Sequence, residues 1–451
     1  MPTPPCTAVD LARQVRAGQL DPVDVTAAAL DRIAADSRAA AAFRHVRREE
    51  ALSEAAHLAR RPDRGALPLA GVPVAIKEVT AVRGEYPAWS MTDGRRFDSD
   101  SDIVERLRAA GAVIIGTTRT PQSCLWPMTD DQDAIVANPW ASTYTAGGSS
   151  GGSATAVAAG LVPLAHGTDA FGSVRSPAAI CGIVGFTPGF GTVPAADRDQ
   201  WSGLYTHGPL ATTVSDAALM LSVLAEKPEL ATVDAVGTLR IALSLRPPGF
   251  ALPIPKEYRA AAAHAGHLLR ESGHRVVAQS PRYGNIAPAM LVRWLAGPGP
   301  GAPVPARPEP RTRRHQQAAA LVRSAGLIRE RPQRKWTARA RAFFDRHDVL
   351  ITPMLATLPP LSRRWSERAW LPNVVAATRL TPFLAPWDFA GFPAMSVPVG
   401  RMPTELPIGV QLVAPPGRES LLLAVAAQLE SLNPWPRTAP DPSPRGSRAS
   451  N

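Results

Sequence analysis

Segments typical of helices and segments typical of strands alternate along this chain of 451 residues. Residues 101–118 (SDIVERLRAAGAVIIGTT) read as a helix, a glycine that ends it and a buried strand, and residues 256–279 repeat that order. Further patterns of these two kinds comprise helices at residues 21–33 and 419–430, and strands at residues 72–79, 239–245, 348–353, 394–400 and 408–414. Such alternation is typical of helices layered on a sheet. We therefore predict an α/β fold: a single large α/β/α layered domain with a mixed, mainly parallel central sheet.

The sequence contains no clear linker between two separately patterned units, although its length could also accommodate two domains. We predict one domain over residues 1–432. Residues 297–310 (GPGPGAPVPARPEP) are predicted to form a loop. Residues 433–451, rich in Pro, Ser and Arg, are predicted to form a disordered tail.

The chain carries a formal net charge of +11, but only four of its 49 basic side chains are lysines. Arginine is abundant throughout, together with alanine and proline, which indicates a bias of the whole composition. The densest basic cluster, residues 306–315 (ARPEPRTRRH), has no aromatic side chains between its arginines. A nucleic-acid surface usually combines a basic stripe with a recognisable module. We therefore expect no nucleic-acid partner.

The sequence also gives expectations about compartment and cofactors. Its first residues show no basic stretch followed by an apolar run, so no secretory signal is expected. No apolar segment reaches membrane-spanning length, which predicts no membrane partner. Cys6, Cys124 and Cys181 are far apart and odd in number, which favours neither a disulfide framework nor a metal site. We expect a cytoplasmic protein without metal or organic cofactor.

Residues 146–154 (AGGSSGGSA) place glycines and serines directly before an apolar, alanine-rich segment. A flexible linker would join separate units, and a Walker loop would end in Gly-Lys-Ser/Thr, so neither fits. Gly147 to Gly151 literally satisfies the Gly-x-Ser-x-Gly nucleophile elbow. That motif needs a preceding strand, which residues 138–146 do not predict, and a later acid and histidine. The elbow remains an open alternative.

A second loop of small residues around a serine follows at residues 167–179 (GTDAFGSVRSPAA). Upstream, Lys77 lies inside an apolar strand of a chain that almost always uses arginine for positive charge. A desolvated lysine can lose its proton and act as a base, whereas arginine cannot. The alternative is a lysine at a strand end that pairs with Glu78 or reaches solvent.

Together these residues resemble the amidase signature family of serine hydrolases. The resemblance extends over most of the chain, through residues 70–78, 138–186, 207–225, 348–353 and 389–413. It implies the amidase signature fold, with a core motif region at residues 70–225. Residues 226–345 are particular to this chain, and we expect them to shape the substrate entrance.

The resemblance implies a Ser-Ser-Lys triad in which Lys77 is the base, Ser149 the bridging serine and Ser173 the nucleophile. It also implies a cis peptide bond at Ser149 and a covalent acyl-enzyme. The oxyanion hole is then formed by four backbone N–H groups, those of Ala170, Phe171, Gly172 and Ser173.

The match departs from the family pattern at Phe171, where glycine is usual. A phenylalanine there could narrow the acyl pocket, or it could disable the oxyanion hole if a positive φ is required. We expect Phe171 and Trp126 to contact substrate. Further expectations concern six residues: a structural His166, an ion pair between Asp169 and Arg175, a buried apolar role for Cys181, and a pocket or core role for Trp201 and Trp387.

The sequence thus predicts an amidase that hydrolyses the C–N bond of a small carboxamide or acylated amine, with a homodimer left open. Three alternatives remain. The chain could be the glutaminase subunit of a tRNA-dependent amidotransferase, or an amide-forming acyltransferase in a biosynthetic pathway. It could also be a catalytically impaired binding protein on an amidase fold, because of Phe171.

Overall fold

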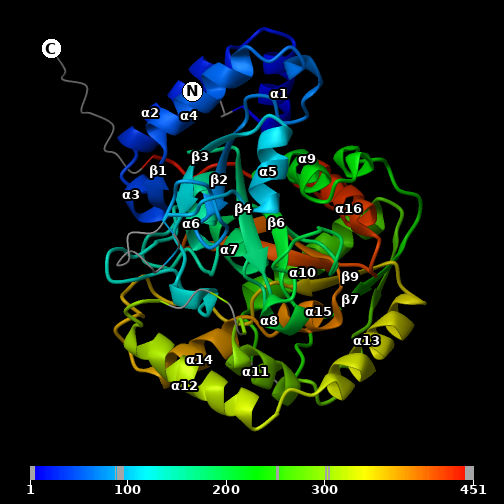
Figure 1. The fold of residues 1–451 in the computed structure, drawn as a ribbon. Coiled ribbons are helices and arrows are strands. Elements are labelled where there is room, and N and C mark those ends of the chain that lie inside the picture. The colour runs from blue at the N-terminus through cyan, green and yellow to red at the C-terminus, as the bar shows by residue number, and fades with distance from the viewer. Residues whose placement is uncertain are drawn as a thin grey trace, which may run out of the picture.

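In the part of the chain that the structure describes, one sheet of eleven strands runs in the order β1-β3-β2-β4-β6-β5-β10-β11-β9-β7-β8 (Figure 1). The computed structural model describes residues 6–86, 88, 96–249, 253–299, 302 and 305–441. The strands are β1 (Phe43–Val46), β2 (Pro73–Lys77), β3 (Val113–Thr118), β4 (Leu164–Asp169), β5 (Val184–Thr187), β6 (Thr206–Ala211), β7 (Arg240–Leu243), β8 (Arg275–Ala278), β9 (Val349–Pro353), β10 (Ala394–Arg401) and β11 (Pro407–Val413).

Parallel pairs lie toward the two ends of this sheet, and antiparallel pairs form its middle. Strands β3, β2 and β4 are parallel neighbours, as are β9, β7 and β8. From β4 through β6, β5, β10 and β11 to β9, every neighbouring pair is antiparallel. The prediction of one α/β domain with a mixed sheet is confirmed, and the antiparallel middle was not evident from the alternation of helix and strand.

Helices cover both faces of the sheet because alternate residues of its strands point to opposite sides. The helices are α1 (Ala8–Arg16), α2 (Pro22–Ala35), α3 (Ala39–Ala42), α4 (Arg48–Ala59), α5 (Asp102–Ala109), α6 (Gly151–Ala158), α7 (Arg175–Cys181), α8 (Gln200–Gly203), α9 (Val214–Leu224), α10 (Lys256–Glu271), α11 (Ala287–Ala296), α12 (Pro310–Ser324), α13 (Glu330–Phe344), α14 (Trp370–Leu380), α15 (Ala385–Ala390) and α16 (Glu419–Leu432). In β2, Val74 and Ile76 belong to the core under α5, α9 and α16, whereas Ala75 belongs to the core under α2 and α6.

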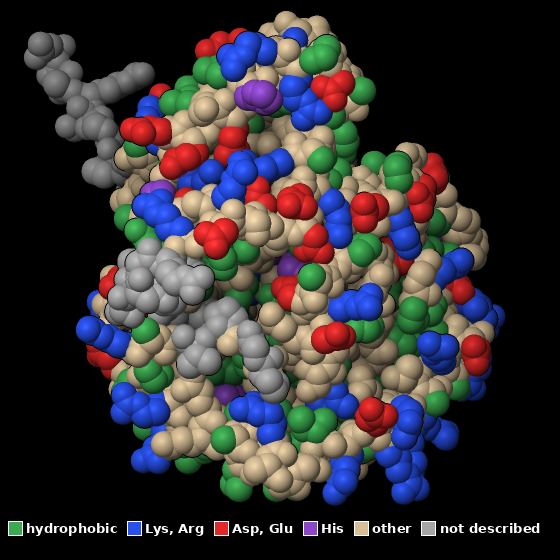
Figure 2. Space-filling model, in the orientation of Figure 1, with side chains coloured by type: hydrophobic (Ala, Val, Ile, Leu, Met, Phe, Trp, Pro, Cys, Tyr) green, Lys and Arg blue, Asp and Glu red, His purple; other side chains and the backbone are tan. Residues whose placement is uncertain are grey.

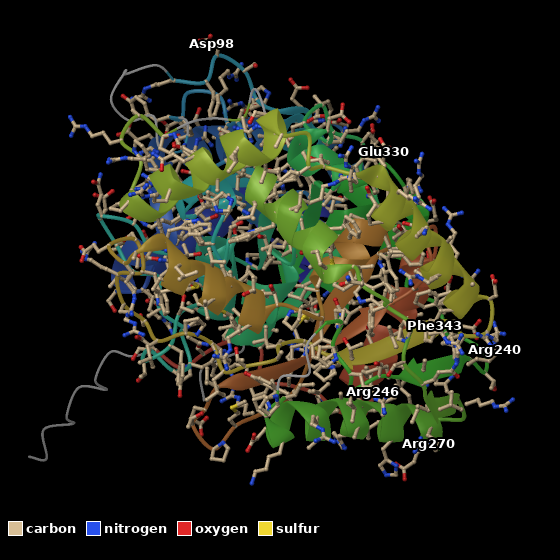
Figure 3. All side chains as sticks on the ribbon, turned by 90° about the horizontal axis from the view of Figure 1, so that it is seen from below. Asp98, Arg240, Arg246, Arg270, Glu330 and Phe343 are labelled. Atoms are coloured by element: carbon tan, nitrogen blue, oxygen red, sulfur yellow. The ribbon has the colours of Figure 1, made fainter. Side chains whose placement is uncertain are left out.

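A third apolar cluster, rich in tryptophan and phenylalanine, lies under helices of residues 226–345, which we call the variable region. Helices α11, α12 and α13 belong to this region, and with α14 they form the lower part of the molecule in Figure 1. Figure 3 views this side from below, and Glu330 and Phe343 mark the course of α13 along the edge of the molecule. The variable region therefore packs on the same domain and does not form a second one.

The expected disordered tail is wrong over its first residues, because part of this segment packs on the domain. The indole N–H of Trp435 donates to the carbonyl of Thr212, and the N–H of Ala439 donates to the carbonyl of Ala158. Residues 442–451 lie outside the described residues. The loop predicted at residues 297–310 is confirmed where it is described, except that Pro310 already begins α12; residues 300, 301, 303 and 304 lie outside the described residues.

The surface carries basic side chains over the whole face in view in Figure 2, with acidic side chains among them and no single basic stripe. Within the described ranges, every helix is too short or too polar to cross a membrane.

Gly152, in the first turn of α6, is required by the close approach of three segments. A Cβ atom there would lie 2.4 Å from the carbonyl oxygen of Ala42 and 2.6 Å from the backbone nitrogen of Arg119. We predict that Gly152→Ala lowers the free energy of unfolding by about 1–3 kcal/mol or more, since backbone atoms must move. Urea denaturation measures this.

Gly237→Ala is the matched control, since an added Cβ at Gly237 meets nothing within 4 Å. It should change the free energy of unfolding by no more than about 0.5 kcal/mol. Equal midpoints for the two variants would contradict this account of Gly152.

Candidate active site

Lys77 is the last residue of β2, and its side chain is completely buried. Its Nζ atom lies 2.7 Å from Oγ of Ser149 and 2.9 Å from Oγ1 of Thr168, with the carbonyl oxygen of Thr168 at 3.3 Å. Lys77 makes no ion pair with any residue in the described ranges, although Glu78 and Asp169 are near enough to favour its charge. Burial nevertheless lowers the pKa of the Lys77 amino group.

The carboxylate of Glu78, which the sequence suggested as a partner of Lys77, binds other residues. Its carboxylate accepts from Arg44 at 2.8 Å and from the backbone N–H of Thr120 at 2.6 Å. The alternative in which Lys77 pairs with Glu78 or reaches solvent is therefore wrong.

The glycine-serine run forms a tight loop that brings Ser149 to Lys77. Gly147 has a φ of +87°, and the peptide bond between Gly148 and Ser149 is cis, as the resemblance implied. A Cβ at Gly148 would lie 2.7 Å from the carbonyl oxygen of Trp126, and one at Gly151 would lie 2.3 Å from Oγ1 of Thr129. The glycines are therefore needed where the loop passes against this neighbouring segment.

The nucleophile elbow is not formed here. Residues 138–146, all of them described, contain only isolated bridges and no strand before Ser149. His166, which the sequence suggested as structural, is fully buried and bonds through its ring to His207 at 2.9 Å.

Asp169 organises the loop that contains Ser173. Its carboxylate pairs with Arg175, as predicted, and accepts from the N–H groups of Gly172 and Val174. Burial alone would raise the pKa of Asp169, but the Arg175 guanidinium and these hydrogen bonds lower it to about 2. The N–H of Ser150 also donates to the carbonyl of Ser173 at 3.1 Å, which ties the two serine loops together.

This arrangement removes Gly172 from the four backbone N–H groups predicted to form the oxyanion hole. The N–H of Gly172 is taken by Asp169 at 2.5 Å and is directed away from an oxyanion. The N–H groups of Ala170, Phe171 and Ser173 donate to no group of the described chain and remain available.

Phe171 fits its position without backbone strain. The positive φ of this loop, +104°, belongs to Gly172, where an added Cβ would lie 2.5 Å from Leu384. Phe171 itself has a negative φ, and its ring packs edge-on against Trp201 at 5.8 Å. Phe171 therefore does not strain the loop through a positive φ, as the sequence analysis had considered. Its side chain instead contributes to the wall of a cavity.

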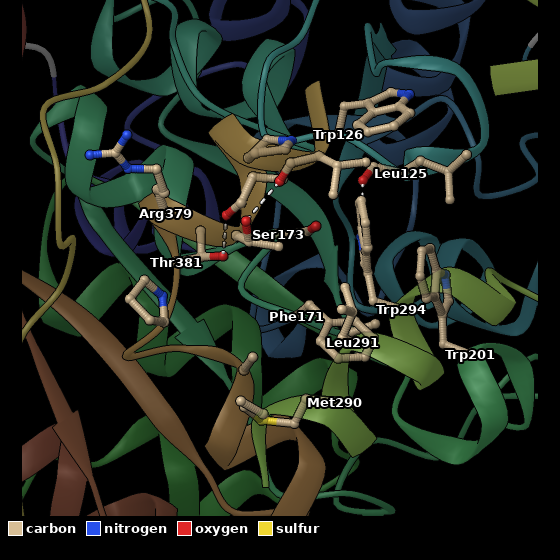
Figure 4. A pocket seen from close by; sticks show the side chains of 18 of the residues that line it. Leu125, Trp126, Phe171, Ser173, Trp201, Met290, Leu291, Trp294, Arg379 and Thr381 are labelled. Carbon is tan, nitrogen blue, oxygen red and sulfur yellow. Dashed lines mark hydrogen bonds between the residues drawn. The ribbon is translucent and has the colours of Figure 1, made fainter. Parts of the chain in front are cut away.

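Ser149 and Ser173 open into a cavity of about 1010 Å³ (Figure 4). Its wall is largely apolar and aromatic and includes Phe171, Trp126 and Trp201. Trp387 does not line it and lies in the aromatic core instead. Cys181 is a buried core residue, as expected.

Sequence reasoning missed most of the residues that line this cavity, among them Cys124, Thr168, Tyr205 and Arg379. The thiol of Cys124 lies near both Lys77 and Ser149, and burial raises its pKa. Cys124 and Ser123 both have left-handed backbones, with φ of +53° and +54°. Nothing in the residue types of this segment signalled such a turn. Among the described residues, no cluster of three or more His, Cys, Asp or Glu could hold a metal ion.

Comparison with known proteins decides the family. Residues 24–299 and 303–423 match the family model described as Amidase. The chain belongs to the amidase family. It is 38% identical over 424 residues to "Putative amidase AmiB2" of Mycobacterium tuberculosis, covering 89% of this chain and 90% of that one. The acylamidase of Rhodococcus erythropolis is 31% identical, with 95% and 96% covered.

Among solved structures, a 6-aminohexanoate cyclic dimer hydrolase matches this amidase with a TM-score of 0.84 and 29% identity, covering 95% of this chain and 97% of that one. The fold prediction is thereby confirmed. As an amidase the protein is a hydrolase that acts on amide bonds.

Asp169 offers a direct test of how the amidase holds its serine loop. We predict that Asp169→Asn lowers the free energy of unfolding by about 1.5–3 kcal/mol, because the buried Arg175 then keeps only one of its two carboxylate partners, Asp388, and loses its charged hydrogen bonds to Asp169. Thermal or urea denaturation measures this. The control is Glu330→Gln, which removes an exposed pair with Arg334 and should leave the midpoint nearly unchanged. Similar losses in both variants would contradict the proposed anchoring.

Proposed function

We propose that this amidase cleaves the C–N bond of a carboxamide or acylated amine through Lys77, Ser149 and Ser173, by way of an acyl-enzyme. The observation that carries the proposal is the buried amino group of Lys77, 2.7 Å from Ser149 in the wall of the cavity that also contains Ser173. A lysine whose pKa is lowered by burial can serve as a general base near neutral pH.

The proposed reaction begins with neutral Lys77. In that form Nζ has a free lone pair, so the hydroxyl of Ser149 donates to Nζ while Nζ donates to Thr168. Oγ of Ser173 attacks the carbonyl carbon of the substrate, its proton passes to Ser149, and the proton of Ser149 passes to Lys77. The tetrahedral intermediate places its negative oxygen at the N–H groups of Ala170, Phe171 and Ser173.

Collapse of the intermediate breaks the C–N bond. The departing amine takes a proton from Ser149, which is resupplied by Lys77, so the base is neutral again. Water then attacks the acyl-enzyme, gives its proton along the same route, and releases the acid and free Ser173. Lysine-based variants of the serine triad assign these roles without histidine.

The cavity indicates a bulky apolar group on the substrate. Aromatic side chains line it, and such pockets bind ligands chiefly by burying apolar surface. The available N–H of Phe171 supports an active centre over an impaired one. Phe171 and Trp201 would contact the apolar part of the substrate.

Labelling with a fluorophosphonate, followed by peptide mapping, tests the proposed roles. We predict label on Ser173, with loss of label and of amide hydrolysis in Ser173→Ala. Lys77→Met should lose at least about a hundredfold in labelling rate, because it keeps the buried chain but removes the base. Lys335→Ala, an exposed lysine on α13, is the control and should label normally.

Circular dichroism and urea unfolding establish that each variant is folded before its labelling is compared. Label on Ser149 would contradict the assignment of the nucleophile. Undiminished labelling of folded Lys77→Met would contradict the role of the lysine.

A further inference from the structure

Arg379 is the only charged side chain among the described residues that line the cavity. It lies in the last turn of α14, which also contributes Val374, Ala377 and Thr378 to the wall. The rest of the described wall is apolar or uncharged, so this guanidinium is the charge on the described wall that a substrate meets. Arginine stays charged at every pH at which the enzyme can work.

Arg379 has no protein partner in the described ranges. It is exposed, and it makes no ion pair and no hydrogen bond there. Other arginines near the cavity are engaged: Arg311 pairs with Asp130 and Glu309, and Arg175 pairs with two aspartates. A cation free of acids at the mouth of an apolar cavity is available to a ligand.

The position of Arg379 relative to Ser173 indicates how a bound substrate would be oriented in the cavity. In Figure 4, Ser173 lies between Arg379 on one side and the wall of Phe171, Trp201 and Trp294 on the other. A substrate whose amide carbon is at Ser173 would extend one half toward the aromatic wall and the other toward Arg379.

We propose that the amidase prefers amides that carry an apolar group on one side of the scissile bond and a carboxylate on the other, and that Arg379 binds the carboxylate. Guanidinium and carboxylate match in geometry and form charge-assisted hydrogen bonds. The partly apolar surroundings of the cavity mouth strengthen this pairing relative to water. The inference rests on the proposed function, since it takes Ser173 as the point of attack.

Two matched substrate pairs test this preference, one for each half of the amide. The first compares N-(4-phenylbutanoyl)glycine with the neutral N-(4-phenylbutanoyl)ethanolamine. The second compares glutaryl 4-phenylanilide with the neutral pentanoyl 4-phenylanilide. In at least one pair, the wild-type enzyme should give the anionic substrate a kcat/KM about tenfold higher, because one well-placed charged hydrogen bond has this magnitude.

Arg379→Gln should abolish this difference by raising KM for the anionic substrate, with kcat and the neutral substrate changed less than twofold. A group that binds ground state and transition state equally acts on KM. Arg379→Lys should restore part of the preference. Added salt should weaken the preference of the wild type, since it screens an exposed pair.

Arg259→Gln removes an exposed arginine of α10 that does not line the cavity, and it controls for the loss of one positive charge. The proposal is overturned if both pairs show equal kcat/KM in the wild type, or if the preference survives Arg379→Gln. Fluorophosphonate labelling of Ser173 separates the two ideas. Labelled enzyme without an anionic preference would refute this inference alone, and unlabelled enzyme would refute the proposed function.

Discussion

The burial of the Lys77 amino group is the constraint on which the rest of the site depends. An ammonium ion at the end of β2 would be costly to desolvate, and none of the described residues forms an ion pair with it. Burial therefore lowers the pKa of this amine, and in the proposed reaction the neutral form directs its lone pair at Ser149. Thr168 and Ser149 supply hydrogen-bond partners to Nζ of Lys77. The buried amine is therefore accommodated without an ion pair and becomes a candidate base.

The guanidinium of Arg175 is also buried, but unlike the amine of Lys77 it stays charged, and it holds the loop of Ser173 in place. Arg175 stays charged because Asp169 and Asp388 surround it, and Asp169 then accepts the N–H groups of Gly172 and Val174. This network fixes one end of the serine loop, and the contact between Ser150 and Ser173 fixes it to the glycine-serine run. The same network explains why fewer N–H groups remain for an oxyanion than the sequence suggested.

The features predicted from sequence are those that local residue types determine. The strands at Lys77 and after Gly111, and the tight loop around Ser149, follow from short apolar runs and from glycine. The antiparallel pairing of β10 and β11 with their neighbours depends on contacts between distant segments, which no local pattern records. The same holds for the hydrogen bond from the N–H of Gly172 to the side chain of Asp169, and for the hydrogen bond from the indole of Trp435 to the carbonyl of Thr212.

Arg379 and Cys124 show which residues of the site could not be predicted from the sequence. Each lies in a segment without a motif, and only the fold brings it to the cavity of Ser149 and Ser173. The resemblance to the amidase signature family supplied the expected roles of Lys77, Ser149 and Ser173. The structure adds the burial and hydrogen bonds that make those roles physically reasonable.

The protonation state of Lys77 is the most direct test of the account. The chain has only four lysines, Lys77, Lys227, Lys256 and Lys335, so a sample labelled with ¹⁵N-lysine gives few Nζ signals, and Lys77→Met assigns one of them. We predict that the Lys77 signal titrates well below the ordinary range of a lysine amino group, because burial lowers the pKa of Lys77. Titration of Lys77 at the ordinary lysine pKa of about 10.4 would contradict it.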